Sequence, residues 1–397
     1  MAVDGNIEIL RDKNYSKTIK NKMIMKVRSL VFGMLCMLAL GAGFASCSDD
    51  DDDDRREDTG SQVELPRVRA FILNEGAMGA NNAGLAFYAP NKDADFISDI
   101  YKKQNNAQLG DTGNSMIEYE DEIYIAVNVS NRLVKLNAAG VEQKSVSFVD
   151  DNDLSGGIRY IDAEDGYIYA SFWGGVVAKI NAKTLEVADK LTGLGDNMEA
   201  VAICEDMLYV ANSCTADYSM YHNEIKVIDL RTFKLKETLT TVAPNPYTQM
   251  LEEDDKVFFI SVDYNSVDGY VLQMIDPKKN NQVTKIGYAT YMAADNDVLY
   301  LINSITDWVA QTTVNTFFTY NIKTGQINNA SFLKNAPAEL SSITLHMFEV
   351  NDDNGDFYIG ASDYKTNGTI YRFKKDGTFI EKFDAGGINP NSMVFFD

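Results

Sequence analysis

A four-strand pattern that recurs along the chain constrains its fold more than any other feature. The clearest copy spans residues 197–239, where four short β-prone runs alternate with polar turns and show no helical periodicity. Its first two strands meet at Glu205-Asp206. A single antiparallel meander cannot bury both of its faces, whereas copies stacked around an axis can. The repeat therefore predicts an all-β propeller.

The number of copies predicts the number of blades. An aromatic residue marks the second strand of each copy, and these residues are Phe71, Tyr124, Tyr169, Tyr209, Phe258, Tyr300 and Tyr358. Their spacing is near the roughly 40–50 residues of propeller blades, so we expect a seven-bladed β-propeller. The first copy lacks an innermost strand, and the C-terminal run Asn391–Phe396 repeats the Asn-Ser-Met of Asn114–Met116. We therefore expect the C-terminal strand to pair into the first blade and close the ring.

The N-terminal part has the features of a targeting segment. Residues 1–46 are interpreted as an upstream extension plus a lipoprotein signal peptide, because a basic start at Met25–Arg28 precedes an apolar run too short to span a membrane. Phe44–Cys47 resembles the bacterial lipobox, which implies that Cys47 is lipidated and becomes the mature N-terminus. Residues 47–66 are expected to form a tether, because the like charges of Asp49–Asp54 repel one another. This run also resembles an export signal for the outer face of the outer membrane. The propeller is expected to span residues 67–397.

Composition argues against several classes of partner and site. The formal net charge of −22 disfavours nucleic acid and anionic membrane surfaces as partners of the folded part. His222 and His346 are the only histidines, which argues against a multi-histidine metal centre. Cys204 and Cys214 should be unpaired, because Cys214 lies at the far end of its strand, roughly 20 Å from Cys204 at about 3.3 Å per residue.

Loop lengths distinguish the two ends of the predicted ring. Turns between first and second strands are short and acidic, whereas second-to-third connections such as 74–84, 213–223 and 304–316 are long. Binding residues gather on variable loops of a rigid scaffold, so we expect the ligand at the long-loop end. Aromatic and amide side chains are frequent there and suit a large, roughly neutral ligand rich in amide or hydroxyl groups. The alternative is that many of these rings pack beneath loops and that the asparagines stabilise turns. The candidate ligand-binding residues are Asn114, Tyr160, Trp173, Asn197, Tyr218, Tyr221, Tyr247, Tyr264, Tyr291, Trp308, His346 and Asn391.

Catalytic signals are weak. The sequence has no Gly-rich phosphate loop, His/Cys metal spacing or nucleophile elbow, so we predict no catalytic residue and no resident cofactor or metal. Two enzymatic alternatives stay open. Four aspartates could ring the axis and hold a divalent cation, as in some propeller lactonases, and Tyr218 with His222 could do acid–base work as in a lyase. A glycan-binding or protein-docking module is a third alternative. The four aspartates are Asp111, Asp153, Asp196 and Asp263.

Several short motifs resemble a known family. They are Phe71–Gly76 with Asn81–Gly84, and Leu109–Asp111 with Asn114–Met116. Through them, residues 67–397 resemble the YncE-like seven-bladed propeller lipoproteins of gut Gram-negative anaerobes, and within that group the BtuG-like lipoproteins that bind vitamin B12. The resemblance implies a non-enzymatic, surface-exposed protein that captures cobalamin and hands it to a TonB-dependent, BtuB-type outer-membrane transporter. Cobalamin is then the transported ligand, and no contact residue can be carried over from the family.

Overall fold

The computed structural model describes residues 58–90, 96–263, 269–307 and 309–396. The described residues all belong to one compact unit, within 55–397. The predicted signal peptide, the lipidation site Cys47 and two candidate site residues, Tyr264 and Trp308, lie outside the described residues. Within the described residues, no helix has the length and apolar character needed to cross a membrane.

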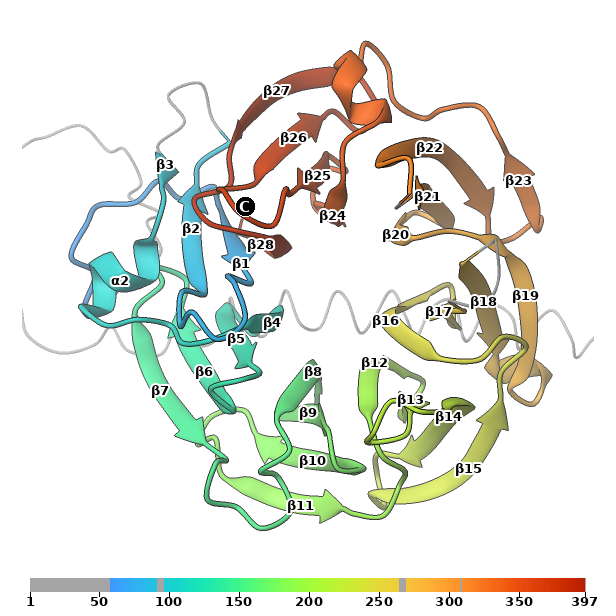
Figure 1. Cartoon of the computed structure of the whole chain (residues 1–397). Helices are drawn as coiled ribbons and strands as arrows, with labels where there is room; N and C mark the ends of the chain where they lie inside the picture. The colour runs from blue at the N-terminus through green and yellow to red at the C-terminus, as the bar shows by residue number, and fades with distance from the viewer. Residues whose placement is uncertain (1–57, 91–95, 264–268, 308, 397) are drawn as a thin grey trace, which may run out of the picture. The chain divides into compact units, whose positions relative to one another are not determined.

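Seven four-stranded antiparallel sheets form the blades of a propeller, which confirms the predicted fold class (Figure 1). The inner strands β28, β4, β8, β12, β16, β20 and β24 surround the axis. Blade 1 contains β28 (Pro390–Phe396), β1 (Arg69–Asn74), β2 (Gly84–Tyr88) and β3 (Phe96–Ile97); blade 2 contains β4 (Gly113–Tyr119), β5 (Glu122–Val127), β6 (Arg132–Asn137) and β7 (Glu142–Ser147); blade 3 contains β8 (Ile158–Glu164), β9 (Tyr167–Phe172), β10 (Val176–Asn181) and β11 (Val187–Leu191).

The remaining blades follow the chain in order. Blade 4 contains β12 (Met198–Cys204), β13 (Met207–Cys214), β14 (Tyr221–Asp229) and β15 (Lys234–Thr240); blade 5 contains β16 (Pro246–Glu253), β17 (Lys256–Val262), β18 (Tyr270–Asp276) and β19 (Gln282–Tyr288); blade 6 contains β20 (Tyr291–Asp295), β21 (Val298–Asp307), β22 (Thr312–Asn321) and β23 (Gln326–Asn328); blade 7 contains β24 (Leu345–Val350), β25 (Phe357–Ala361), β26 (Thr369–Phe373) and β27 (Phe379–Asp384). Helix α2 (Ile100–Asn105) and the 3-10 turns η1 (Pro277–Lys279) and η2 (Ala338–Ser341) lie in connections.

The C-terminal strand closes the ring as the sequence predicts. Strand β28 pairs antiparallel with β1, in a ladder from Arg69↔Phe396 to Asn74↔Pro390. Phe71 of β1 packs edge-on against Phe396 and Phe87, with ring centroids 5.9 and 5.8 Å apart. This pairing covers an edge of β1 that would otherwise be free, which removes a template for pairing with other chains.

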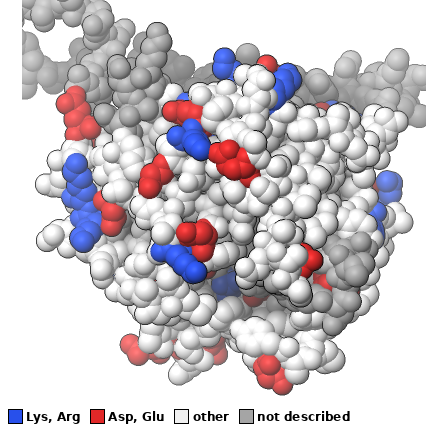
Figure 2. Space-filling model, turned by 45° about the horizontal axis from the view of Figure 1, so that its top comes forward, with Lys and Arg blue, Asp and Glu red and all other residues white. Residues whose placement is uncertain are grey.

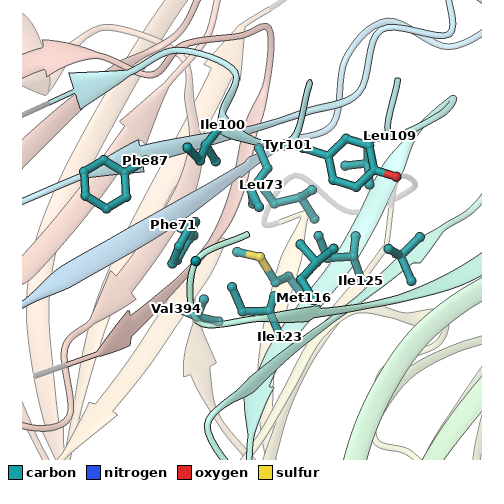
Figure 3. Close-up of a cluster of buried hydrophobic side chains, with 14 of the residues drawn as sticks. Phe71, Leu73, Phe87, Ile100, Tyr101, Leu109, Met116, Ile123, Ile125 and Val394 are labelled. Atoms are coloured by element: carbon teal, nitrogen blue, oxygen red, sulfur yellow. The ribbon is translucent and has the colours of Figure 1, made fainter. Parts of the chain in front are cut away.

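Apolar side chains fill the space between adjacent blades. Figure 3 shows one such cluster, in which Phe71 and Leu73 of blade 1 meet Met116 and Ile123 of blade 2. The repeated aromatic of the second strand is fully buried in six blades and half-buried in blade 6, where it is Tyr300. These rings therefore pack in the core.

Acidic turns mark one end of the propeller. In five blades both residues of the turn between the first and second strands have positive φ, for example Glu205 at 49° and Asp206 at 61°. This is the type I′ geometry that suits a two-residue hairpin, and Asn and Asp tolerate it. We call this the short-turn end. Cys204 lies beside one of these turns and pairs with Met207 across the ladder, while Cys214 lies at the far end of β13; both are free, as predicted.

Residues 58–66 of the expected tether contact the propeller. Leu65 is buried in the cluster between blades 1 and 2, and the Arg69 guanidinium donates to Asp58 Oδ1 at 2.7 Å. The folded part therefore begins before β1.

Candidate ligand-binding site

A cavity of about 510 Å³ opens at the long-loop end of the axis. We call it the axial cavity. It collects side chains from six of the seven blades, blade 4 being the exception, from the first residues of inner strands and from loops on the same end. The lining residues are Glu75, Gly76, Met78, Thr112, Asn114, Arg159, Tyr160, Trp173, Tyr247, Thr248, Gln249, Val262, Tyr270, Thr290, Tyr291, His346, Tyr364, Asn389 and Asn391.

Bulges at the start of the inner strands place these side chains. Within the described strands, the pairing of the inner strand with its neighbour shifts register at this point in six blades. A bulge gives the inner strand extra residues and re-aims their side chains. The extra residues are Asn114 of β4, Arg159 and Tyr160 of β8, Glu199 and Ala200 of β12, Tyr247, Thr248 and Gln249 of β16, His346 of β24, and Asn391 of β28. Eight of the nineteen lining residues thus come from one repeat position, varied from blade to blade; Glu199 and Ala200 hold this position in blade 4 but do not line the cavity.

A buried arginine lies in this wall. Arg159 is 6% exposed, and its Nε donates to Glu199 Oε2 at 2.7 Å. Its Nη1 donates to Asn114 Oδ1. Trp173 Nε1 donates to the other Glu199 oxygen at 2.8 Å, and the guanidinium lies over the Trp173 ring at 4.6 Å. Burial raises the pKa of Glu199, but two N–H donors and the guanidinium favour its ionised form, so the two residues form an ion pair.

A second polar pair lies across the cavity. His346 Nε2 is 3.5 Å from Glu75 Oε2, and His346 Nδ1 is 3.0 Å from the Pro390 carbonyl. Because a carbonyl only accepts, Nδ1 carries the proton and Nε2 is able to accept a proton or a metal ion. Burial lowers the pKa of His346 and raises the pKa of Glu75, although the Arg159 charge opposes the second effect. The pair therefore favours its neutral state.

Tyrosines supply much of the remaining wall: Tyr160, Tyr247, Tyr270, Tyr291 and Tyr364. Burial raises the pKa of Tyr160 and of Tyr291, so both hydroxyl groups stay protonated. Tyr291 donates its hydroxyl to the Leu345 carbonyl at 2.7 Å, which fixes its ring. Tyr364 is half exposed and Met78 mostly exposed, and both line the cavity. The cavity thus offers ring faces, neutral amides and an internally paired charge.

The structure brings together most of the residues predicted from the sequence. Asn114, Tyr160, Trp173, Tyr247, Tyr291, His346 and Asn391 line the axial cavity. Asn197, Tyr218 and Tyr221 do not line it. Asn197 is buried and donates to the Thr215 carbonyl, Tyr218 is exposed in the β13–β14 loop, and Tyr221 pairs with Cys214 in β14.

The sequence interpretation missed Arg159, Glu199, Glu75, Tyr270 and Tyr364. A signal for the first two was present, because Arg159 and Glu199 occupy the repeat position that Asn114 and Asn391 hold in their own blades. The sequence interpretation relied on aromatic rings and amides and therefore missed the charged residues at this position.

The hypothesis of an axial metal ring gains no support from the contacts of the aspartates. Asp111 accepts from the Gly79 amide, Asp153 pairs with Lys190, and Asp196 lies 3.2 Å from His222. Among the described residues, no group of three or more His, Cys, Asp or Glu side chains has a geometry that could hold a metal ion. On the face shown in Figure 2, side chains of both signs lie interspersed.

Comparisons with known proteins support the fold. Residues 69–220 match the family model "Domain of unknown function (DUF5074)", which covers blade 1 apart from β28, blades 2 and 3, and the first two strands of blade 4. No curated protein is similar enough to this chain to count as a match. The chain is similar to Kuenenia stuttgartiensis hydrazine synthase, with a TM-score of 0.53 and 11% identity over 66% of this chain and 77% of that chain. It also aligns with the Neurospora crassa Pan2 WD40 domain, with a TM-score of 0.47 and 9% identity over 67% of this chain and 78% of that one. At such identities the likeness concerns the fold alone.

Proposed function

We propose that this propeller is a non-enzymatic binding protein that holds a corrinoid in the axial cavity. Anchored at the outer membrane through a lipid on Cys47, it passes cobalamin to a TonB-dependent, BtuB-type transporter. The observation that carries the proposal is the set of bulged residues, because it gathers aromatic faces and neutral amides from five blades around one cavity. The resemblance described above supplies the choice of ligand.

The chemistry of a corrinoid suits this cavity. A corrin ring has apolar faces and a rim of amide side chains, which match tyrosine and tryptophan rings beside asparagine amides. A cavity of about 510 Å³ is within the range of small-molecule sites, roughly 300–1,000 Å³. The exposed side chains of Met78 and Tyr364 offer further contact area for the part of a large ligand that extends beyond it.

Calorimetry with cyanocobalamin tests this proposal. Binding should release or absorb heat and raise the melting temperature of the soluble chain from Ser48 onward, since a ligand that binds only the folded state stabilises it. Tyr247→Ala, in the cavity wall, should weaken binding about tenfold or more, because a buried aromatic contact often contributes 1.4 kcal/mol or more. Tyr371→Ala is the control, since Tyr371 is buried in blade 7 outside the axial cavity. Absence of both heat and stabilisation would remove the proposal.

One observation favours a second candidate, a lyase or lactonase. Glu75 and His346 have shifted pKa values and meet in the cavity, which is how acid–base catalysts are arranged. Turnover of a lactone or uronic-acid glycan that is lost in both Glu75→Gln and His346→Phe, with binding retained, would favour the enzyme. Binding of cyanocobalamin without turnover of such substrates would favour the carrier.

A further inference from the structure

Two polar groups in the wall of the axial cavity lack a hydrogen-bond partner. The recorded bonds of the Arg159 guanidinium use Nε and Nη1, and Nη2 donates to none of the described residues. Thr248 Oγ1 is buried and likewise has no partner among the described residues. Buried polar groups are nearly always satisfied, so the buried Thr248 hydroxyl, beside an arginine nitrogen that has no recorded bond, points to a ligand group that completes them.

Arg159 is held rigidly in place. Glu199 and Asn114 fix two of its nitrogens, and the rings of Trp173 and Tyr160 lie 4.6 and 5.5 Å from its central carbon. The three side chains bonded or stacked most closely come from blades 2, 3 and 4. Little rotational freedom remains to be lost when Nη2 donates to a ligand, which favours binding.

The charges around Arg159 determine which kind of ligand group can accept its hydrogen bond. Its positive charge is already matched by Glu199, and Glu75 interacts with it from the β1–β2 loop. A carboxylate placed at Nη2 would add a second or third negative charge at close range in a poorly hydrated cavity. A neutral carbonyl oxygen accepts the same hydrogen bond without that repulsion.

We propose that Arg159 anchors the ligand by donating from Nη2 to a neutral amide carbonyl, and that Glu199 sets the preference for an amide over a carboxylate. Thr248 completes the subsite with its hydroxyl group. This inference rests on the proposed function only in that the axial cavity binds a ligand. It identifies Arg159 and Glu199 as a pair that determines ligand specificity, and the sequence interpretation did not predict either residue.

The test compares cyanocobalamin with its monocarboxylic acids, in which one peripheral amide is hydrolysed to a carboxylate. We expect at least one of these acids to bind the wild-type chain tenfold or more weakly than cyanocobalamin. Arg159→Met should weaken cyanocobalamin binding about tenfold or more and should remove the difference between amide and acid. Glu199→Gln leaves the arginine charge unmatched, so it should reduce or reverse the preference for the amide over the acid. If Glu199 had only a structural role, this ratio of affinities would not change.

A matched control separates anchoring from folding. Arg372 is a half-buried arginine, paired with Asp356 at 2.8 Å in blade 7, and it does not line the cavity. Arg372→Met should lower the melting temperature without changing affinity or the amide-to-acid ratio. A folded Arg159→Met chain with wild-type affinity, or a Glu199→Gln chain with an unchanged ratio, would overturn the inference while leaving the proposed function standing.

If the wild-type chain binds no corrinoid, the proposed function fails. A smaller amide probe then tests whether Arg159 binds an amide carbonyl. The chain has two tryptophans, so Trp308→Phe leaves Trp173 as the reporter beside Arg159. Propionamide should change Trp173 fluorescence more than propionate does, and Arg159→Met should abolish that response. Equal responses to the two probes, or none, would contradict the anchor.

Discussion

At the scale of single residues, burial decides which acidic groups carry a charge. A second cavity of about 650 Å³ opens at the short-turn end of the axis, lined by Glu118, Glu252, Glu349 and Asp352 among others. Burial, with Asp352 adding to it, raises the pKa of Glu349 to about 8. The two ends of the axis therefore differ, since the long-loop end matches its buried charges whereas the short-turn end gathers like charges.

Glu349→Gln should stabilise the protein at alkaline pH. The folded-state pKa lies above the unfolded value of about 4.3, so the native state holds its proton more tightly and stability falls as pH rises from about 4 to 8. Glutamine removes this effect, and we expect a gain of about 2 kcal/mol at pH 8 but little at pH 4. Urea unfolding at both pH values measures it. Glu339→Gln, an exposed residue paired with Lys382, should bring no such gain. A gain of equal size at both pH values would show that ionisation is not its cause.

At the scale of elements, two structural features form the candidate site. The bulge at the start of the inner strand turns one repeat position toward the cavity, and the pairing of β28 with β1 brings Asn391 to the same ring. Asn391 then donates to the Gly113 and Asn114 carbonyls of blade 2, which ties the closing strand to its neighbour. The closure thus completes both the core and the site.

Truncation after Asn389 should abolish cooperative folding. Without β28, the edge of β1 and the side chain of Phe71 lose their cover, so the unfolding transition should broaden and the chain should associate. Denaturant unfolding followed by tyrosine fluorescence, with size-exclusion chromatography, measures both effects. A chain shortened at its other end, to begin at Asp58, should keep its sharp transition. An equally sharp transition in the C-terminal truncation would mean that closure contributes little to stability.

At the scale of the whole molecule, the proposed function needs the propeller to be tethered to a membrane. We propose that Cys47 and the acidic residues that follow it perform this task. Acyl chains bind a bilayer with about 0.8 kcal/mol per buried CH₂ group, so several chains give stable anchoring. The acidic run would hold the negatively charged propeller away from an anionic surface.

Cys47→Ser should release the protein from membranes. Expressed in a Gram-negative host, the wild-type chain is expected in the membrane fraction and within reach of protease added to intact cells. The serine variant should be found in the soluble fraction, because it has no thiol to receive the lipid. Cys204→Ser is the matched control, since Cys204 is buried in blade 4. Persistence of the Cys47→Ser chain in the membrane fraction would contradict the anchor.

The sequence by itself determined the number of blades, the closing strand and the end of the axis where the aromatic and amide side chains gather. These features are local or repeated, so turn residues such as Glu205-Asp206 and the shared Asn-Ser-Met reveal them. Only the tertiary structure showed the cluster around Arg159. Its hydrogen bonds join residues 26 to 45 positions apart, in neighbouring blades that come together only when the chain folds. Its charges come to matter because folding removes them from water, and no pattern in the sequence records which carboxylate meets which guanidinium.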